Sequence, residues 1–132
     1  MSRIVVLLIA IALSSCKSPT EPDVIALGSP FELKAGASAE LPDGFRVKFD
    51  RVSADSRCPI DVQCVSAGDA TVVLLISDEG KNPVPIDLRV NAGSQISYSN
   101  HTIRLTALQP FTRSDRQINA LEYVATLVVN AP

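Results

Sequence analysis

The chain has 132 residues and a formal net charge of −2 at neutral pH, from 12 Lys and Arg against 14 Asp and Glu. This length predicts a single domain that is large enough to bury a core. The slightly acidic balance argues against a nucleic-acid partner, because displacing counterions from phosphates needs a strong excess of basic residues.

The first fifteen residues have the pattern of a signal peptide. Arg3 precedes an apolar run over residues 4–13, and this run is too short for a bilayer-spanning helix of roughly 20 residues. Its end, Leu13-Ser14-Ser15-Cys16, resembles the lipobox of bacterial lipoproteins, which has an aliphatic residue, two small residues and a cysteine. The resemblance implies cleavage before Cys16, a diacylglycerol on the Cys16 sulfur and an acylated new amino terminus.

A lipidated Cys16 also accounts for the odd number of cysteines. The chain has 3 cysteines, and an odd count in an exported protein otherwise requires a free thiol or an intermolecular bridge. The alternative is an unmodified Cys16 thiol at the end of an ordinary signal peptide. Several acyl chains hold a protein firmly on a membrane, so we expect an envelope protein anchored through Cys16.

Residues 16–23 form the expected tether. The stretch over residues 17–23 contains two prolines and no large apolar side chain, a composition that stays extended and solvated. Lys17 follows the cysteine, and the sorting rule of Gram-negative lipoproteins retains those with Asp at this position in the inner membrane. By this resemblance, the outer membrane is the expected location.

From residue 24 onward the apolar residues recur with a period of two. Short strands are predicted over residues 31–35, 37–41 and 45–52, and the turn tripeptide Pro42-Asp43-Gly44 joins the last two. The stretch over residues 69–77, whose apolar centre does not alternate, predicts a central strand that is buried on both faces.

The second half of the chain continues this pattern. Strands are predicted over residues 86–90, 95–98, 103–107 and 121–130, with turns at 78–83, 92–94 and 99–101 and a long connection over residues 111–120. No stretch of the mature chain has a convincing helical stripe. The sequence therefore predicts an all-β domain over residues 24–132, a single antiparallel β-sandwich, either immunoglobulin-like or a small barrel, of about seven to nine short strands with one disulfide-closed loop.

Cys58 and Cys64 are the pair that we expect to close this loop. In an exported chain such a close pair normally forms a disulfide, which here should stabilise the fold by about 2 kcal/mol. A zinc site or a redox centre lacks its other parts, because the chain has 1 histidine and no Cys-x-x-Cys motif. Asp55, Asp61 and Asp69 flank the loop without calcium-site spacing and are interpreted as turn caps, so neither a metal nor another cofactor is expected.

The cysteine-loop motif carries a further resemblance. Asp55-Ser56-Arg57-Cys58-Pro59, four residues, Cys64 and then a glycine before an apolar strand resemble a pattern of small secreted or lipid-anchored bacterial proteins. The segments over residues 105–110 and 122–129 are similar too. The resemblance implies a shared β-fold in which the cysteine loop is a landmark, and it implies no particular activity. Members of this group carry a Trp shortly after the second cysteine, where this chain has Val65-Ser66.

Catalysis is not expected, because the residues for it are few. A Ser-His-Asp triad would have to use His101, which falls in a predicted turn and is interpreted as solvated. No other nucleophile, carboxylate pair or metal set stands out.

The expected function is a non-catalytic binding or adaptor module that engages a protein or glycan. Its candidate contact residues are Arg57 and Asp61 in the cysteine loop and Arg113 and Arg116 in the long connection. Ordinary solvated loops are the plain alternative for both segments. Two further alternatives are a structural spacer lipoprotein of the envelope and a protease inhibitor that presents an exposed Arg57 on the braced loop.

Overall fold

The structure, a computed structural model, describes residues 25–132. The predicted signal peptide and the whole predicted tether, including Cys16, lie outside the described residues. The described chain forms the strands β1 Phe31–Lys34, β2 Ser38–Glu40, β3 Arg46–Asp55, β4 Ala70–Ser77, β5 Val84–Arg89, β6 Gln95–Tyr98, β7 His101–Gln109 and β8 Val124–Asn130, and the 3-10 turn η1 Ala120–Glu122. Over residues 25–132, no helix has the length and apolar character needed to cross a bilayer.

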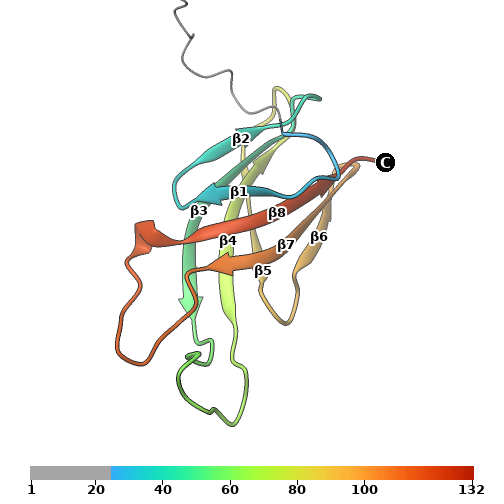
Figure 1. Cartoon of the computed structure of the whole chain (residues 1–132). Coiled ribbons are helices and arrows are strands. Elements are labelled where there is room, and N and C mark those ends of the chain that lie inside the picture. The colour runs from blue at the N-terminus through green and yellow to red at the C-terminus, as the bar shows by residue number, and fades with distance from the viewer. Residues whose placement is uncertain (1–24) are drawn as a thin grey trace, which may run out of the picture.

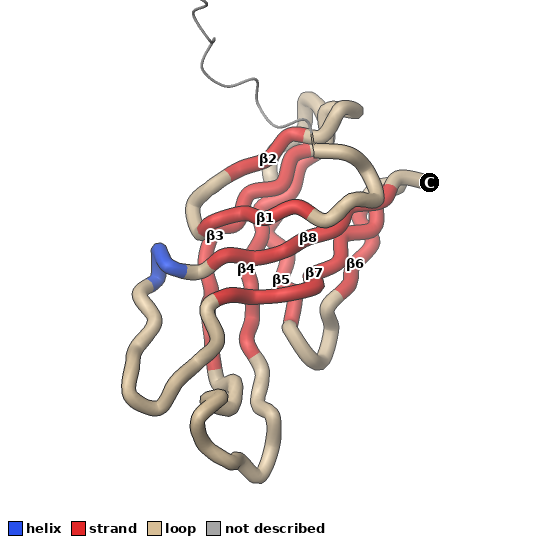
Figure 2. Tube along the Cα trace, in the orientation of Figure 1, coloured by secondary structure: helices blue, strands red, loops and turns tan. Residues whose placement is uncertain are grey.

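The strands form two antiparallel four-stranded sheets that pack face to face (Figures 1 and 2). One sheet has the order β1-β8-β7-β6 and the other β2-β3-β4-β5. The prediction of an all-β antiparallel sandwich is confirmed. The sequence left a sandwich and a small barrel open. Strands β2 to β5 are neighbours in chain order in one sheet, as are β6 to β8 in the other, where β1 pairs with β8. No hydrogen-bonded ladder joins the two sheets at their edges among the described strands.

The core lies between the two sheets, and period-two patterning builds it. Successive side chains of a strand point to opposite faces, so every second residue of β3 and β8 faces inward. Val47 and Phe49 of β3 and Leu127 and Val129 of β8 are 0% exposed. Burial of each such side chain stabilises the fold by about 1.5–3 kcal/mol.

Strand β4 is interior, as its unbroken apolar run predicted. It pairs with β3 on one side and with β5 on the other. Its inward residues Val72, Leu74 and Ile76 are 0% exposed, and Val73 on the other face is only 4% exposed. The prediction of burial on both faces is therefore confirmed for the centre of this strand.

Several strand boundaries differ from the sequence prediction. Strand β3 continues to Asp55, because register shifts let it stay paired with β4. Strand β7 begins at His101, which was expected in a turn. Strand β8 begins at Val124, because Asn119 and Glu122 form a capping box that holds the preceding residues in η1.

The sandwich has two different ends, which are clear in Figure 1. We call one end the tip, formed by the loops over residues 56–69 and 110–119, and the other the base, formed by the turns at residues 41–45, 78–83 and 99–100. Strand β8 runs from tip to base: Tyr123, just before it, contacts Asp55, whereas Val129 accepts a hydrogen bond from Gly28. Six residues of strand span roughly 20 Å, so the segment leading into β1 lies far from the tip.

Candidate functional site

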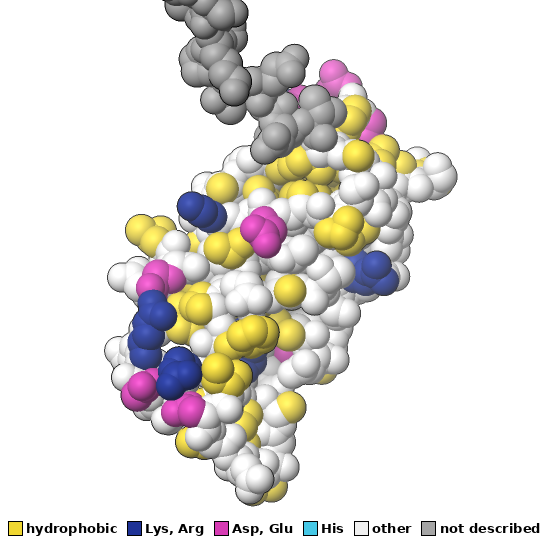
Figure 3. Space-filling view, viewed as in Figure 1, with side chains coloured by type: hydrophobic (Ala, Val, Ile, Leu, Met, Phe, Trp, Pro, Cys, Tyr) yellow, Lys and Arg dark blue, Asp and Glu magenta, His cyan; other side chains and the backbone are white. Residues whose placement is uncertain are grey.

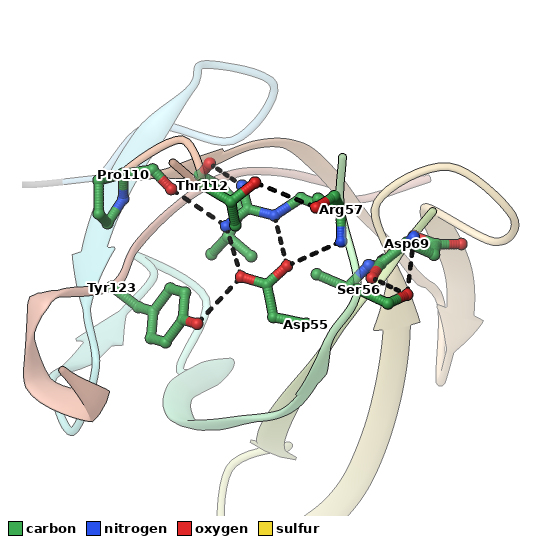
Figure 4. A network of polar contacts seen from close by, with 9 residues as sticks. Asp55, Ser56, Arg57, Asp69, Pro110, Thr112 and Tyr123 are labelled. Carbon is green, nitrogen blue, oxygen red and sulfur yellow. Dashed lines mark hydrogen bonds and ion pairs between the residues drawn. The ribbon is translucent and has the colours of Figure 1, made fainter. Parts of the chain in front are cut away.

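The tip contains a network of polar contacts centred on Asp55 and Arg57 (Figure 4). Asp55 is the last residue of β3, and Arg57 follows two positions later, so their side chains lie on the same face. The Arg57 guanidinium donates from Nε and Nη2 to the two oxygens of the Asp55 carboxylate at 2.8 and 2.7 Å. It also donates from Nη1 to the Leu108 carbonyl at 2.9 Å and from Nη2 to the Pro110 carbonyl at 3.0 Å. Arg57 thereby links the cysteine loop to the end of β7 and the start of the long connection.

Tyr123 and Thr112 complete this network from the C-terminal half of the chain. The Tyr123 hydroxyl donates to Asp55 at 3.0 Å, and the Thr112 hydroxyl donates to the Arg57 carbonyl at 3.1 Å. Burial alone raises the pKa of Asp55, but the hydrogen bonds from Arg57 and Tyr123 outweigh it and hold that pKa below its usual value. Burial and the Asp55 carboxylate raise the pKa of Tyr123 to about 12. Asp55 is therefore a carboxylate and Tyr123 a neutral donor at neutral pH.

The prediction of an exposed Arg57 is wrong. The side chains of Arg57 and Asp55 are each 10% exposed, because a bidentate partner and two carbonyls hold the guanidinium inside the tip. Arg57 cannot enter the pocket of a trypsin-like protease without leaving this network. The protease-inhibitor alternative thus loses the exposed arginine on which it depended.

The cysteine loop is closed by the predicted disulfide. Cys58 and Cys64 are bonded, with their Cα atoms 5.9 Å apart. The closed ring is too small to bury its own apolar side chains, so Ile60 is 61%, Val62 45% and Val65 110% exposed. The sequence reading overlooked this apolar surface, although three aliphatic residues in and beside a seven-residue ring were its signal.

The neck of the cysteine loop requires a glycine at position 68. Gly68 has φ +66, and a Cβ atom there would lie 1.8 Å from the Ser56 carbonyl oxygen. The two strands approach so closely because Ser56 and Asp69 exchange hydrogen bonds, and the Cys58 amide donates to the Ala67 carbonyl at 2.8 Å.

Asp69 ties this neck to the turn after β5. Its carboxylate accepts hydrogen bonds from the backbone amides of Ala70, Asn91 and Ala92 at 2.9, 2.9 and 3.1 Å. Burial alone raises the pKa of Asp69, but these donors and the Arg89 charge bring it below its usual value. Asp69 acts as a turn cap, which is the role that the sequence suggested for it.

Asp61 joins the two loops of the tip. Its carboxylate accepts hydrogen bonds from the Ser114 amide at 2.9 Å and from the Ser114 hydroxyl. The Ile60 amide donates to the Thr112 carbonyl at 2.9 Å. The Ser114 donors hold the pKa of Asp61 below its usual value. Asp61 was predicted as a contact residue, and the structure gives it an exposed position and an intramolecular partner.

Arg113 and Arg116 lie on either side of a tight turn in the long connection. An isolated antiparallel bridge pairs their backbones. Their side chains are 46% and 54% exposed and form ion pairs with Asp115 and Glu122, also exposed. Figure 3 shows basic and acidic side chains gathered at this end of the molecule beside hydrophobic ones. Both arginines are thus exposed, and their role as contact residues stays a prediction.

Two open grooves flank the contact between Arg57 and Thr112. We call the first, of about 480 Å³, the arginine groove; its lining includes Arg57, Thr112, Arg113, Arg116, Gln117 and Tyr123. We call the second, of about 370 Å³, the apolar groove; its lining includes Ile60, Ala67, Val90, Ala107, Leu108 and Phe111. Because Arg57 and Thr112 border both, the grooves lie side by side. Phe111, 59% exposed at the rim of the apolar groove, was not singled out from the sequence.

At the base, His101 is placed differently from its prediction. Its side chain is 10% exposed rather than solvated, and its ring stacks on Phe45 with centroids 4.1 Å apart. Its Nε2 lies 2.6 Å from the Asp43 carboxylate, and this hydrogen bond is the main cause of the lowered pKa of Asp43. The other ring nitrogen, Nδ1, is buried without a partner. A catalytic triad needs that nitrogen to reach a nucleophile, so this pair does not form one.

Two further findings bear on the function of this protein. Within residues 25–132, no group of three or more His, Cys, Asp or Glu side chains is placed to hold a metal ion. Comparison of the chain with family models, with curated proteins and with solved structures found no match. The contacts and exposed residues of the tip are therefore the basis for a functional proposal.

Proposed function

We propose that this protein is a lipid-anchored, non-catalytic binding module of the bacterial cell envelope, and that the tip is its contact surface. The observation that carries the proposal is the contrast between the interior and the surface of the tip. Its interior is fixed by the Asp55–Arg57 ion pair and a disulfide, whereas its surface exposes Ile60, Val65 and Phe111. Exposed apolar side chains on a fixed scaffold are typical of interaction sites.

The position of the tip supports this function for an anchored protein. The segment over residues 25–30 enters the sandwich at the base (Figure 1). A lipid on Cys16, which precedes that segment in the sequence, would hold the base toward the membrane and direct the tip away from it. Lys17 favours the outer membrane by the sorting rule of Gram-negative lipoproteins. A structural spacer has no use for exposed apolar groups at its far end, so the binding module is the better explanation.

The anchor is tested by fractionation of cells that express the full chain or Cys16→Ser. We expect the unsubstituted protein in the outer-membrane fraction, with a cysteine that carries a diacylglycerol and an N-acyl chain found by mass spectrometry, and Cys16→Ser as an uncleaved or released form. A Cys16 peptide that carries a free thiol would contradict the anchor.

The contact surface is tested by photo-crosslinking in living cells. A photoreactive amino acid at Val65 or Phe111 should give a crosslinked product of discrete mass. The same group at Asn82, an exposed residue of the base, serves as the matched control. Equal crosslinking from tip and base, or none from either tip position, would contradict a binding role for the tip.

A further inference from the structure

The first observation concerns two like charges that face each other in the long connection. Arg113 and Arg116 are partners in an antiparallel bridge, so their side chains project to the same face. Each guanidinium has its own exposed carboxylate partner, Asp115 for Arg113 and Glu122 for Arg116. The turn thus presents two guanidinium groups together on one face, an arrangement suited to an anionic ligand.

Both arginines are available to an incoming anion. They line the same open groove, and their own partners, Asp115 and Glu122, are 66% and 38% exposed. Exposed ion pairs are weak because water screens them, so a ligand carboxylate can replace either partner at little cost. The planar fork of a guanidinium matches a carboxylate with two parallel hydrogen bonds. The Asp61–Ser114 contacts hold the turn between the arginines in place.

The neighbouring apolar groove restricts the class of ligand. Its rim carries the exposed side chains of Ile60 and Phe111, which favour an aliphatic or aromatic side chain. The two grooves share Arg57 and Thr112, so one ligand can occupy both. Residues two to four apart in an extended peptide are separated by roughly 7–14 Å, which suits adjacent grooves. A glycan has carboxylates but no large apolar side chain, so a peptide fits better.

We infer that the tip recognises an acidic peptide segment of a protein partner, with a carboxylate at Arg113 and Arg116 and an apolar side chain in the groove beside Phe111. This inference rests on the proposed function and specifies its partner. The overall net charge of the chain is −2, so the arginine groove is a local site for an acidic ligand rather than part of a general basic surface.

The test is a selection from a phage-displayed library of random 12-residue peptides on the purified full chain in detergent. Selected peptides are then synthesised with a fluorescent label, and their affinity is measured by anisotropy. We expect enrichment of Asp or Glu within four residues of Leu, Ile or Phe. Arg113→Gln with Arg116→Gln should weaken binding about tenfold or more, as should Phe111→Ser. High salt should weaken binding to the unsubstituted protein.

The matched control is Arg46→Gln with Arg104→Gln, which removes two exposed arginines outside both grooves and changes the net charge equally. It should bind the peptides as the unsubstituted protein does. No enrichment, peptides without acidic residues, or full binding by the Arg113 and Arg116 variant would each overturn the inference. If crosslinking at Val65 and Phe111 still yields a product in those cases, the proposed function stands and only the acidic-peptide specificity fails.

Discussion

Each end of the sandwich contains an aspartate paired with a nitrogen-bearing side chain, but the pairs differ in how completely their polar atoms are satisfied. At the tip, Arg57 and Asp55 are both 10% exposed, and the guanidinium has three acceptor groups. At the base, Asp43 is 34% exposed, and His101 keeps one buried nitrogen without a partner. The pair at the tip thus joins three segments of the chain, whereas the pair at the base joins the turn at residues 41–45 to the first residue of β7.

This difference shows where the molecule depends on single groups. Removal of one member of a buried ion pair leaves the other charge buried and unpaired, which is strongly destabilising. Removal of one member of a more exposed pair costs less stability, because water replaces the missing partner. We therefore expect substitutions at the tip to be more damaging than equivalent substitutions at the base, even though the tip consists of loops.

The largest effect is expected at the neck of the cysteine loop. Gly68→Ala places a Cβ atom 1.8 Å from a carbonyl oxygen, so the neck has to open, and we expect a loss of about 4 kcal/mol in the free energy of unfolding. Urea denaturation measures it. The matched control is Gly80→Ala at the base, where φ is +72 and no atom lies within 4 Å of the added group; only backbone strain of about 1 kcal/mol remains. Equal losses would show that φ alone matters.

The next effect compares the aspartates of the two pairs directly. Asp55→Asn should lower the free energy of unfolding by about 3 kcal/mol, and Asp43→Asn by less than about 1 kcal/mol. Because the folded pKa of Asp55 is below its unfolded value, its contribution is full above the unfolded pKa, near pH 4, and is lost as the pH falls through the folded pKa. Urea denaturation at several pH values measures both parts. A larger loss from Asp43→Asn would reverse the comparison.

The disulfide should have an intermediate effect. Cys58→Ser with Cys64→Ser opens a small ring, and we expect a loss of about 2 kcal/mol in the free energy of unfolding. Amide hydrogen exchange should show the loss of protection in the cysteine loop and not in the turns of the base. Free thiols at both positions in protein purified without reductant would contradict the bond.

The smallest effect concerns Tyr123. Tyr123→Phe removes its hydrogen bond to Asp55, which should lower the free energy of unfolding by about 1 kcal/mol at neutral pH. The folded pKa of about 12 exceeds the usual value near 10, so this contribution is full below pH 10 and is lost as the pH rises toward 12. In Tyr123→Phe, the free energy of unfolding should not show this decrease between pH 10 and pH 12. Spectrophotometric titration of the phenolate checks the folded pKa.

The sequence by itself determined the fold class and the cysteine bridge. Period-two patterning around Phe49 predicted a strand that the structure contains, because alternation follows from local strand geometry. The apolar run at the centre of residues 69–77 likewise predicted the buried strand β4. The close spacing of Cys58 and Cys64 likewise predicted their bond. Local signals of this kind do not depend on the other half of the chain.

Only the tertiary structure decided what the loops expose. Arg57 looks solvated in sequence, yet its carbonyl acceptors at Leu108 and Pro110 lie more than fifty positions away. His101 is buried for a similar reason, since Asp43 is 58 positions distant. Folding brings such partners together, and no local pattern records the pairing. The proposed acidic-peptide site depends on this long-range packing, because the two grooves lie where the cysteine loop meets the long connection.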